Sequence, residues 1–328
     1  MNMIKLIHSM IPIIMNSLPT EIKRYEILPK LDEISLVILR HVLLGKGLPL
    51  EFSYSLQRSI IKNGLSLTIY FWEELDKNTI CRYAAECGSL EVLKCANERG
   101  YPWNQNVCSY AAESGSVECL KYAMEWMSVD MDPNICSMAA KSGSLDLLIY
   151  ARENGCPWDE DTCAYAARHG RVDLLRYLHE NGCPWNRLTC ENAVRYGGIE
   201  CLKYARNNDC PWDERTANIA AEEGHLEILK YLIDNGCPLN QSICIFPAGR
   251  GSFECLKYLH ERGCHWDERT CTFAAEGNDL ECLKYAHENG CPWNEDTYEA
   301  AECLNNVKCL KYLQENGCPQ PVPESSYY

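Results

Sequence analysis

Cysteine is the residue type that most suggests chemistry in this sequence, which has 22 cysteines among 328 residues. In the stretch ENGCPWDEDTC, residues 153–163, Cys156 and Cys163 enclose a run of acidic residues. Thiols and carboxylates at such spacing can hold a metal ion, and two thiols can form a disulfide or a redox pair. Nearly the same words recur at Glu180, Glu261, Glu288 and Glu315. The sequence therefore has either a site copied several times or a repeated structural joint.

The cysteines form three ladders, each of which advances by one repeat. The loop ladder is Cys156, Cys183, Cys210, Cys237, Cys264, Cys291 and Cys318. The helix-start ladder is Cys81, Cys108, Cys136, Cys163, Cys190, Cys244 and Cys271, and the second-helix ladder is Cys119, Cys201, Cys255, Cys282 and Cys309. Neighbours within a ladder should lie about 8–10 Å apart, whereas a disulfide needs Cα atoms about 4.4–6.8 Å apart. We predict packing thiols within each ladder, while pairs across ladders, such as Cys156 with Cys163, stay open.

The stretch HERGCHWDERTC is the best candidate for a metal site. Its His260, Cys264, His265 and Cys271 are zinc-ligand types, but their spacing matches no known zinc motif. A histidine also recurs at the His260 position in other repeats, near a helix end where a cation is favourable. We predict no metal and no cofactor, with zinc kept as an alternative. The sequence has no nucleophilic triad, phosphate-binding glycine loop or HExxH word, so we predict no catalytic residues and no enzyme.

A repeat of 27 residues, with one step of 28, organises the chain from about residue 78. Nine units are clear, and a weaker tenth precedes them around Gly64. Each unit predicts two short helices, such as DTCAYAARHG followed by VDLLRYLHEN, residues 161–181. We expect Asp161 or Thr162 to cap the first helix and Gly170 to end it in a left-handed conformation, with Asn278 and Asn305 in that place in the last repeats. Stacked helix pairs predict an all-α solenoid.

Within these units the stretch TCAYAARHGRVDLLRYLHENG resembles the ankyrin-repeat family, and His225 after Gly224 matches the Gly-His turn of that family. The resemblance covers about residues 78–319 and implies an ankyrin-type helical-repeat solenoid. Family units have about 33 residues, so these units should have shortened β-turn fingers or none. The short units also resemble ankyrin families of giant viruses and protists. We expect the solenoid at 51–318 and a Pro-rich flexible tail at 319–328.

Partner recognition should use positions that vary between repeats while the scaffold stays constant. In the first helices, two such positions lie four residues apart, and the family resemblance implies that they line a concave groove. The predicted partner-binding residues are Arg82, Glu86, Ser109, Glu113, Ser137, Lys141, Arg168, Glu191, Arg195, Asn218, Glu222, Thr272 and Glu276. Because Lys141, Arg168 and Arg195 are consecutive basic residues, one hypothesis is an acidic segment of a partner in the groove. The alternative is a solvated face of mixed charge.

Two further patterns predict packing rather than chemistry. Acidic and basic residues three apart in the second helices, such as Asp173 with Arg176, Glu200 with Lys203, and Glu227 with Lys230, predict solvated ion pairs. A row of tryptophans follows the Gly-Cys-Pro turns. An exposed binding strip is one interpretation, but we favour indoles that pack over the joint with the next repeat. The row is Trp103, Trp158, Trp185, Trp212, Trp266 and Trp293.

The N-terminal segment, residues 1–50, lies outside the repeat. Its stretch LPTEIKRYEILPKLDEISLVILRHV, residues 18–42, resembles the first part of an F-box, although the usual closing cysteine and tryptophan are missing. The resemblance implies docking to the adaptor of a cullin-type ubiquitin ligase. The alternative is a helical cap that shields the first repeat. The residues that carry the resemblance are Leu18, Pro19, Glu21, Ile22, Ile27, Leu28, Leu31 and Leu36.

Composition narrows the class of partner. The net charge of −15 disfavours nucleic acid, and no apolar stretch reaches the ~18 residues of a membrane span. No secretory signal is evident, and we expect a cytoplasmic monomer with free thiols. The sequence predicts a non-catalytic scaffold that binds a protein partner of unknown identity. The alternative function is an F-box-like substrate adaptor of a ubiquitin ligase.

Overall fold

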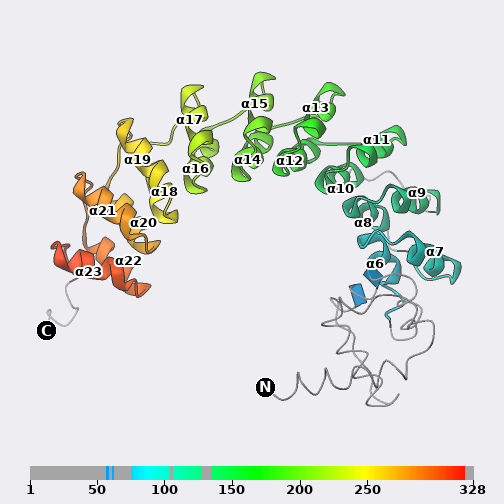
Figure 1. Ribbon diagram of the computed structural model, residues 1–328, viewed down its shortest axis with the longest axis horizontal. Helices are drawn as coiled ribbons and strands as arrows, with labels where there is room; N and C mark the ends of the chain where they lie inside the picture. The colour runs from blue at the N-terminus through cyan, green and yellow to red at the C-terminus, as the bar shows by residue number, and fades with distance from the viewer. Residues whose placement is uncertain (1–56, 59–60, 63–74, 104–105, 127–133, 322–328) are drawn as a thin grey trace, which may run out of the picture. The chain divides into compact units, whose positions relative to one another are not determined.

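The computed structural model describes residues 57–58, 61–62, 75–103, 106–126 and 134–321 (Figure 1). The F-box-like stretch and Gly64 of the weaker tenth repeat lie outside these residues, as does most of the Pro-rich tail. The chain divides into two compact units, Met1–Pro157 and Trp158–Tyr328, here called unit 1 and unit 2. The predicted domain limits at residues 50 and 318 stay a prediction.

Eighteen helices form nine consecutive pairs in the described residues, which contain no strand. Unit 1 contains α6 (Ile80–Glu86), α7 (Leu90–Glu98), α8 (Val107–Ser114), α9 (Val117–Trp126), α10 (Asn134–Ser142) and α11 (Leu145–Glu153). Unit 2 contains α12 (Glu160–Arg168), α13 (Val172–Glu180), α14 (Arg187–Arg195), α15 (Ile199–Asn207), α16 (Glu214–Glu222), α17 (Leu226–Asp234), α18 (Ile245–Arg250), α19 (Phe253–Glu261), α20 (Glu268–Glu276), α21 (Leu280–Glu288), α22 (Glu295–Cys303) and α23 (Val307–Glu315). The nine pairs are the nine predicted repeats, and the all-α fold class is confirmed.

Helix α12 shows how the first helix of a pair begins and ends. In α12 the cap is Asp159 rather than the predicted Asp161, and Thr162 completes a capping box from the third helical position. Asp159 lies one residue before the helix, where its carboxylate reaches the backbone N–H of Thr162. After the helix, Gly170 has a φ of 64°, and Asn278 has a φ of 55° at the equivalent place. The predicted left-handed helix ends are therefore confirmed.

The core consists of small residues in the first helices and leucines in the second. Ala166 and Ala167 of α12 are fully buried, which allows neighbouring first helices to pack closely. In Figure 1, the first helices of unit 2, from α12 to α22, lie side by side, and successive ones contact each other. Leu174, Leu175 and Leu178 of α13 have no exposed surface. Full burial of each such side chain contributes about 1.5–3 kcal/mol, so the stacking of repeats stabilises helices too short to persist alone.

The tryptophans pack over the joints between repeats, as predicted. Trp185 stacks on His179 with ring centroids 3.9 Å apart and presents an edge to Tyr204 of the next repeat at 6.3 Å. The same triad recurs with Trp266 and with Trp293. In unit 1, the indole N–H of Trp103 donates to Asn97 Oδ1 at 2.6 Å. The tryptophans of these repeats therefore pack against the tyrosine of the next repeat and hold neighbouring repeats together.

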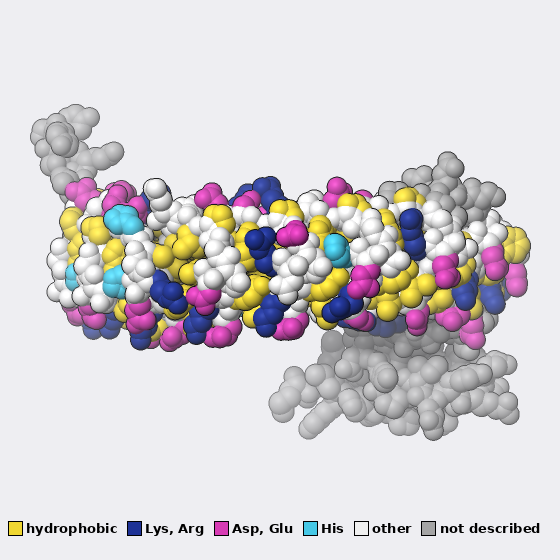
Figure 2. Space-filling model, turned by 90° about the horizontal axis from the view of Figure 1, so that it is seen from above, with side chains coloured by type: hydrophobic (Ala, Val, Ile, Leu, Met, Phe, Trp, Pro, Cys, Tyr) yellow, Lys and Arg dark blue, Asp and Glu magenta, His cyan; other side chains and the backbone are white. Residues whose placement is uncertain are grey.

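The surface charges are mostly interspersed. Of the predicted pairs, Glu200 with Lys203 and Glu227 with Lys230 form, at 2.9 and 2.8 Å. The pair of Asp173 with Arg176 was wrong, because Arg171 binds Asp173 through two parallel hydrogen bonds of 3.0 and 2.9 Å. Figure 2 shows Lys and Arg side chains mixed with Asp and Glu over each unit on the face that it presents. Among the described helices, none is both long and apolar enough to cross a bilayer.

Candidate functional site

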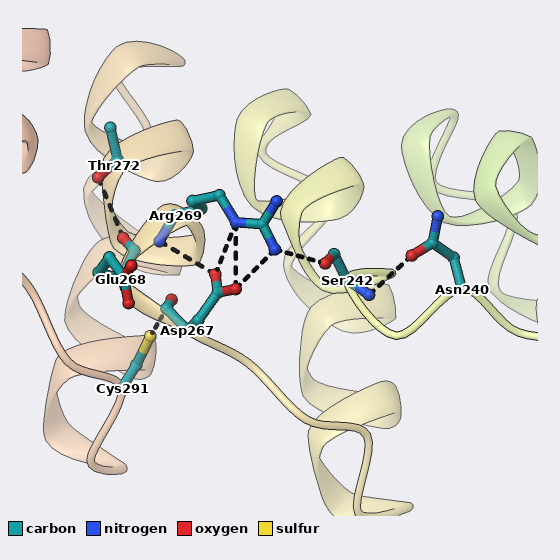
Figure 3. A network of polar contacts seen from close by, with 7 residues as sticks. All are labelled: Asn240, Ser242, Asp267, Glu268, Arg269, Thr272 and Cys291. Carbon is teal, nitrogen blue, oxygen red and sulfur yellow. Dashed lines mark hydrogen bonds and ion pairs between the residues drawn. The ribbon is translucent and has the colours of Figure 1, made fainter.

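The loop thiols bind backbone oxygens at the start of their own repeats. Cys183 Sγ donates to Asp159 O at 3.3 Å, and Cys210 Sγ donates to Asn186 O at 3.4 Å. Figure 3 shows the same contact between Cys291 and Asp267 at 3.2 Å. Each acceptor belongs to the residue that caps the first helix. In these repeats the loop thiol therefore links the end of the second helix to the start of the first.

The helix-start thiols lie against these loop thiols rather than against their ladder neighbours. A hydrogen bond with Cys183, together with burial, raises the pKa of Cys163. The pKa of Cys190 rises for the same reasons beside Cys210. Burial alone raises the pKa of Cys81 to about 11. A protonated thiol is a poor nucleophile and a poor metal ligand at neutral pH, and each of the 22 cysteines is a free thiol. The repeated thiols are therefore packing groups.

The zinc candidate is not assembled in the structure. His260 is stacked on Trp266 with ring centroids 3.8 Å apart, and its Nδ1 lies 3.0 Å from the hydroxyl oxygen of Tyr285. Cys271 is buried in α20, where its pKa is raised by a hydrogen bond with Cys291 and by burial. In the described part of the chain, no three His, Cys, Asp or Glu side chains come close enough to share a metal ion.

A short polar network fixes the joint between neighbouring repeats (Figure 3). Arg269, in the first turn of α20, donates to Asp267 Oδ2 at 2.7 Å and to Ser242 Oγ of the preceding repeat at 2.6 Å. The hydrogen bond from Arg269 lowers the pKa of the Asp267 carboxyl, so the cap stays ionised at neutral pH. The network orders the entry to α20 and thereby positions the exposed side of that helix.

Within each unit, we call the surface formed by the variable residues of its first helices the first-helix face. In unit 1, Arg82 Nε lies 2.7 Å from Glu86 Oε1, four residues along α6. Lys141 Nζ lies 2.7 Å from Glu113 Oε1 of the preceding repeat. Ser137 is buried, and Ser109 is partly buried. The predicted contact residues of unit 1 are thus largely engaged with one another.

In unit 2, the basic residues of this face also have partners. Arg195 Nη1 lies 3.0 Å from Glu223 Oε1, and the Arg168 guanidinium lies over the Tyr196 ring at 4.8 Å. Glu191 turns inward, with only 14% of its side chain exposed. Asn218 is likewise partly buried, and its Oδ1 is fully enclosed. The predicted partner-binding residues lie in two positions, four residues apart, on the first helices. The residues that are accessible to a partner are mostly those in the second position, nearer the end of the helix.

A hollow of about 520 Å³ lies on the first-helix face of unit 2, between the end of α16 and α22. We call it the apolar hollow. Arg250 Nε and Nη2 bind Glu222 Oε1 at its edge, at 3.0 and 2.9 Å. Phe273 and Leu304 keep 38% and 56% of their surface exposed. The residues that line the hollow are Glu222, Ile245, Phe246, Gly249, Arg250, Phe273, Glu276, Gly277 and Leu304.

Two glycines create the space. Gly249 occupies the register position that holds Arg168, Arg195 or Glu222 in other repeats, so no side chain enters the hollow from this position of α18. A Cβ on Gly277 would overlap with the carbonyl oxygen of Gly249. Glycine at this place therefore allows α20 to approach the backbone of α18.

The apolar hollow was not predicted from the sequence, although two of its residues, Glu222 and Glu276, were. A signal was present in the stretch ICIFPAGRG, residues 243–251. There Pro247 replaces the first alanine of the usual pair, and Gly249 replaces the variable charged residue. A departure from an otherwise regular repeat marks a place where the scaffold is modified.

A match to a family model supports the repeat assignment. Residues 136–243 match the family model described as ankyrin repeats in three copies. Among solved structures, the crystal structure of the human ASB11 ankyrin repeat domain matches with 20% sequence identity and a TM-score of 0.39. The match covers 48% of this chain and 83% of that chain. No curated protein matches the sequence.

Proposed function

We propose that this chain is a non-catalytic protein-interaction scaffold that binds a partner protein through its first-helix face. The observation that carries the proposal is the contrast between a constant scaffold and variable exposed residues on one helix of each pair. Three copies match ankyrin repeats, which generally bind proteins and typically lack catalysis. Residues buried in every repeat hold the stack together, while exposed residues that differ from repeat to repeat are free to set specificity.

We expect the partner to make its main contact with the apolar hollow rather than with the basic residues of this face. Lys141 and Arg195 each have a carboxylate within 3.0 Å, and Arg168 lies over an aromatic ring. An acidic segment would have to compete with these existing partners. The partners already present therefore favour the mixed-charge interpretation of these residues. They would then tune specificity around a contact made elsewhere.

The proposal is tested by capture of proteins from the lysate of the native host with the full chain as bait. A double variant, Arg168→Glu with Arg195→Glu, changes two cations on first helices. The matched control, Lys203→Glu with Lys230→Glu, changes two cations on second helices of the same unit, where each lysine is paired with a glutamate. Because these residues would tune specificity, we expect changed recovery of a specific protein with the first variant only. Equal loss with the control would contradict binding through the first-helix face.

The F-box-like segment offers a second, compatible function as a substrate adaptor of a cullin-type ubiquitin ligase in the cytoplasm. It rests on the resemblance of residues 18–42 alone. Co-purification of the ligase adaptor with the full chain, lost when residues 1–50 are deleted, is the expected result. An adaptor that never co-purifies, or that binds equally well after the deletion, would leave the scaffold function alone.

A further inference from the structure

We propose that the apolar hollow is an anchor pocket for one large apolar side chain of a peptide segment in which lysine or arginine flanks that side chain. The inference deepens the proposed function and rests on it, because it assigns a partner chemistry to one part of the first-helix face. The argument uses the shape of the hollow, its apolar surface and the charge at its rim.

The shape suits a side chain. The volume of about 520 Å³ lies within the ~300–1,000 Å³ range of protein ligand sites. An aromatic residue buries about 150–250 Å² when it enters such a site. Among the described first helices of unit 2, only α18 has glycine at the register position of Gly249. The space is therefore specific to this end of the unit.

The apolar side chains that line the hollow are exposed to water, which is energetically unfavourable. A partner that covers them would remove this cost. Ile245 and Phe246 come from α18, Phe273 from α20 and Leu304 from the end of α22. Leu304 and Phe273 both belong to the exposed large apolar residues of the described chain. Three helices thus direct apolar groups to one place, where a single inserted side chain would contact all of them.

The charges at the rim of the hollow determine which residues of the partner peptide can flank the anchor side chain. Two carboxylates, Glu222 and Glu276, and one guanidinium, Arg250, line the hollow. Arg250 is already bound to Glu222 by two hydrogen bonds, whereas Glu276 forms no ion pair within the described residues. Glu299 and Glu302 of the adjacent α22 are exposed. The surplus of carboxylates favours lysine or arginine beside the anchor and opposes acidic segments.

The same charge argument disfavours the end of the chain itself as the occupant. Residues 322–328, VPESSYY, contain aromatic residues but no lysine or arginine, and they include Glu324. A second molecule of this chain has a net charge of −15, which also opposes close approach. A partner segment with basic flanks fits the rim better than either.

The test uses a displayed library of random short peptides, selected against the full chain and then synthesised for Kd measurement. We expect selected peptides to share an aromatic residue or leucine next to lysine or arginine. Gly249→Leu fills the hollow from a helical position that carries long side chains in other repeats, and leucine also has a higher helix propensity than glycine. We expect this variant to weaken binding about 10–100-fold, since an anchor contributes ~1.5–3 kcal/mol.

Two substitution pairs test the apolar anchor and the charge at the rim. Leu304→Glu should weaken binding about tenfold, while Leu188→Glu, at an exposed leucine of α14 outside the hollow, should not change Kd. Glu276→Lys should weaken binding about threefold to tenfold and reduce its salt dependence. Its control, Glu288→Lys on the second helix of the same repeat, should leave Kd unchanged. Far-ultraviolet circular dichroism checks that every variant is folded.

The outcomes distinguish this inference from the proposed function. Peptides that bind the first-helix face but tolerate Gly249→Leu and Leu304→Glu would overturn the anchor pocket and leave the scaffold function standing. Selected peptides with acidic flanks would overturn the charge argument. Peptides that lose binding only when second-helix lysines such as Lys203 and Lys230 are changed to glutamate would overturn both.

Discussion

Within unit 2, the first-helix face differs between α14–α16 and α18–α22. On the first pair of helices, Arg195 reaches Glu223 of the neighbouring repeat, and charged side chains satisfy one another across the joint. On the second group, Gly249 and Gly277 remove side chains, and Phe273 and Leu304 are left exposed. Repeats with the same architecture thus present paired charges on α14–α16 and an exposed apolar hollow on α18–α22. The difference teaches that specificity in such a scaffold can come from deleted side chains as well as from added ones.

Exchange of the residue at one register position should have a large effect on stability in α16 and a small one in α18. Ala220→Pro in α16 places proline late in a nine-residue helix, where it removes a hydrogen bond and clashes with the preceding turn, at a cost of about 3 kcal/mol or more. Pro247→Ala in α18 changes the third residue of its helix, where proline is tolerated, so the free energy of unfolding should change by less than ~1 kcal/mol. Urea denaturation followed by circular dichroism measures both, and equal losses would contradict the difference between the helices.

The two glycines of the apolar hollow should also respond in opposite directions. Gly277→Ala would force its Cβ against the carbonyl oxygen of Gly249 and should lower the free energy of unfolding by about 1–3 kcal/mol. Gly249→Ala meets Phe273 only at 3.4 Å and should raise stability by up to ~1 kcal/mol through helix propensity. Thermal denaturation compares the two, and a neutral Gly277→Ala would show that α18 and α20 do not approach closely.

Thiol modification should separate exposed from packed cysteines. Cys303 is exposed at the end of α22, near the apolar hollow, while Cys190 is fully buried in α14. Burial and the hydrogen bond with Cys210 raise the pKa of Cys190. Mass spectrometry after brief iodoacetamide treatment of the native protein should find Cys303 modified at least ~10-fold faster. Comparable rates would mean that the helix-start thiols are accessible.

Removal of one ion pair at the charged end should have the smallest effect. Arg195→Gln breaks the contact with Glu223, in which both side chains are more than a third exposed. The expected loss of stability is about 0–1 kcal/mol. A loss above ~2 kcal/mol in chemical denaturation would mean that this surface is a structural network rather than a solvated face.

Periodic features were predictable from the sequence because each is enforced locally in every repeat. The left-handed conformation of Asn278 followed from its place in the register, and the packing of Trp185 followed from its recurrence after the turn. The cap of α12 was misplaced by two residues because Asp159 and Asp161 are both good caps, and only the geometry of the entering chain decides between them.

Features that depend on neighbouring repeats were harder to predict. Asp173 has Arg171 and Arg176 within sequence reach, and the choice of Arg171 leaves Arg176 over the Tyr204 ring of the next repeat. The apolar hollow depends on the absence of a side chain at Gly249 and on Phe273 and Leu304 from the next two repeats. No single repeat contains that information, so only the stack reveals it.

Site-specific photo-crosslinking tests the central claim most directly. A photoreactive phenylalanine analogue is placed at Glu276 on α20 or, in the control, at Glu281, an exposed residue on α21 of the same repeat. The full chain is then irradiated with a selected peptide. Our account predicts a covalent adduct from position 276 and little or none from position 281. Adducts in equal yield from both positions, or from position 281 alone, would contradict binding through the first-helix face.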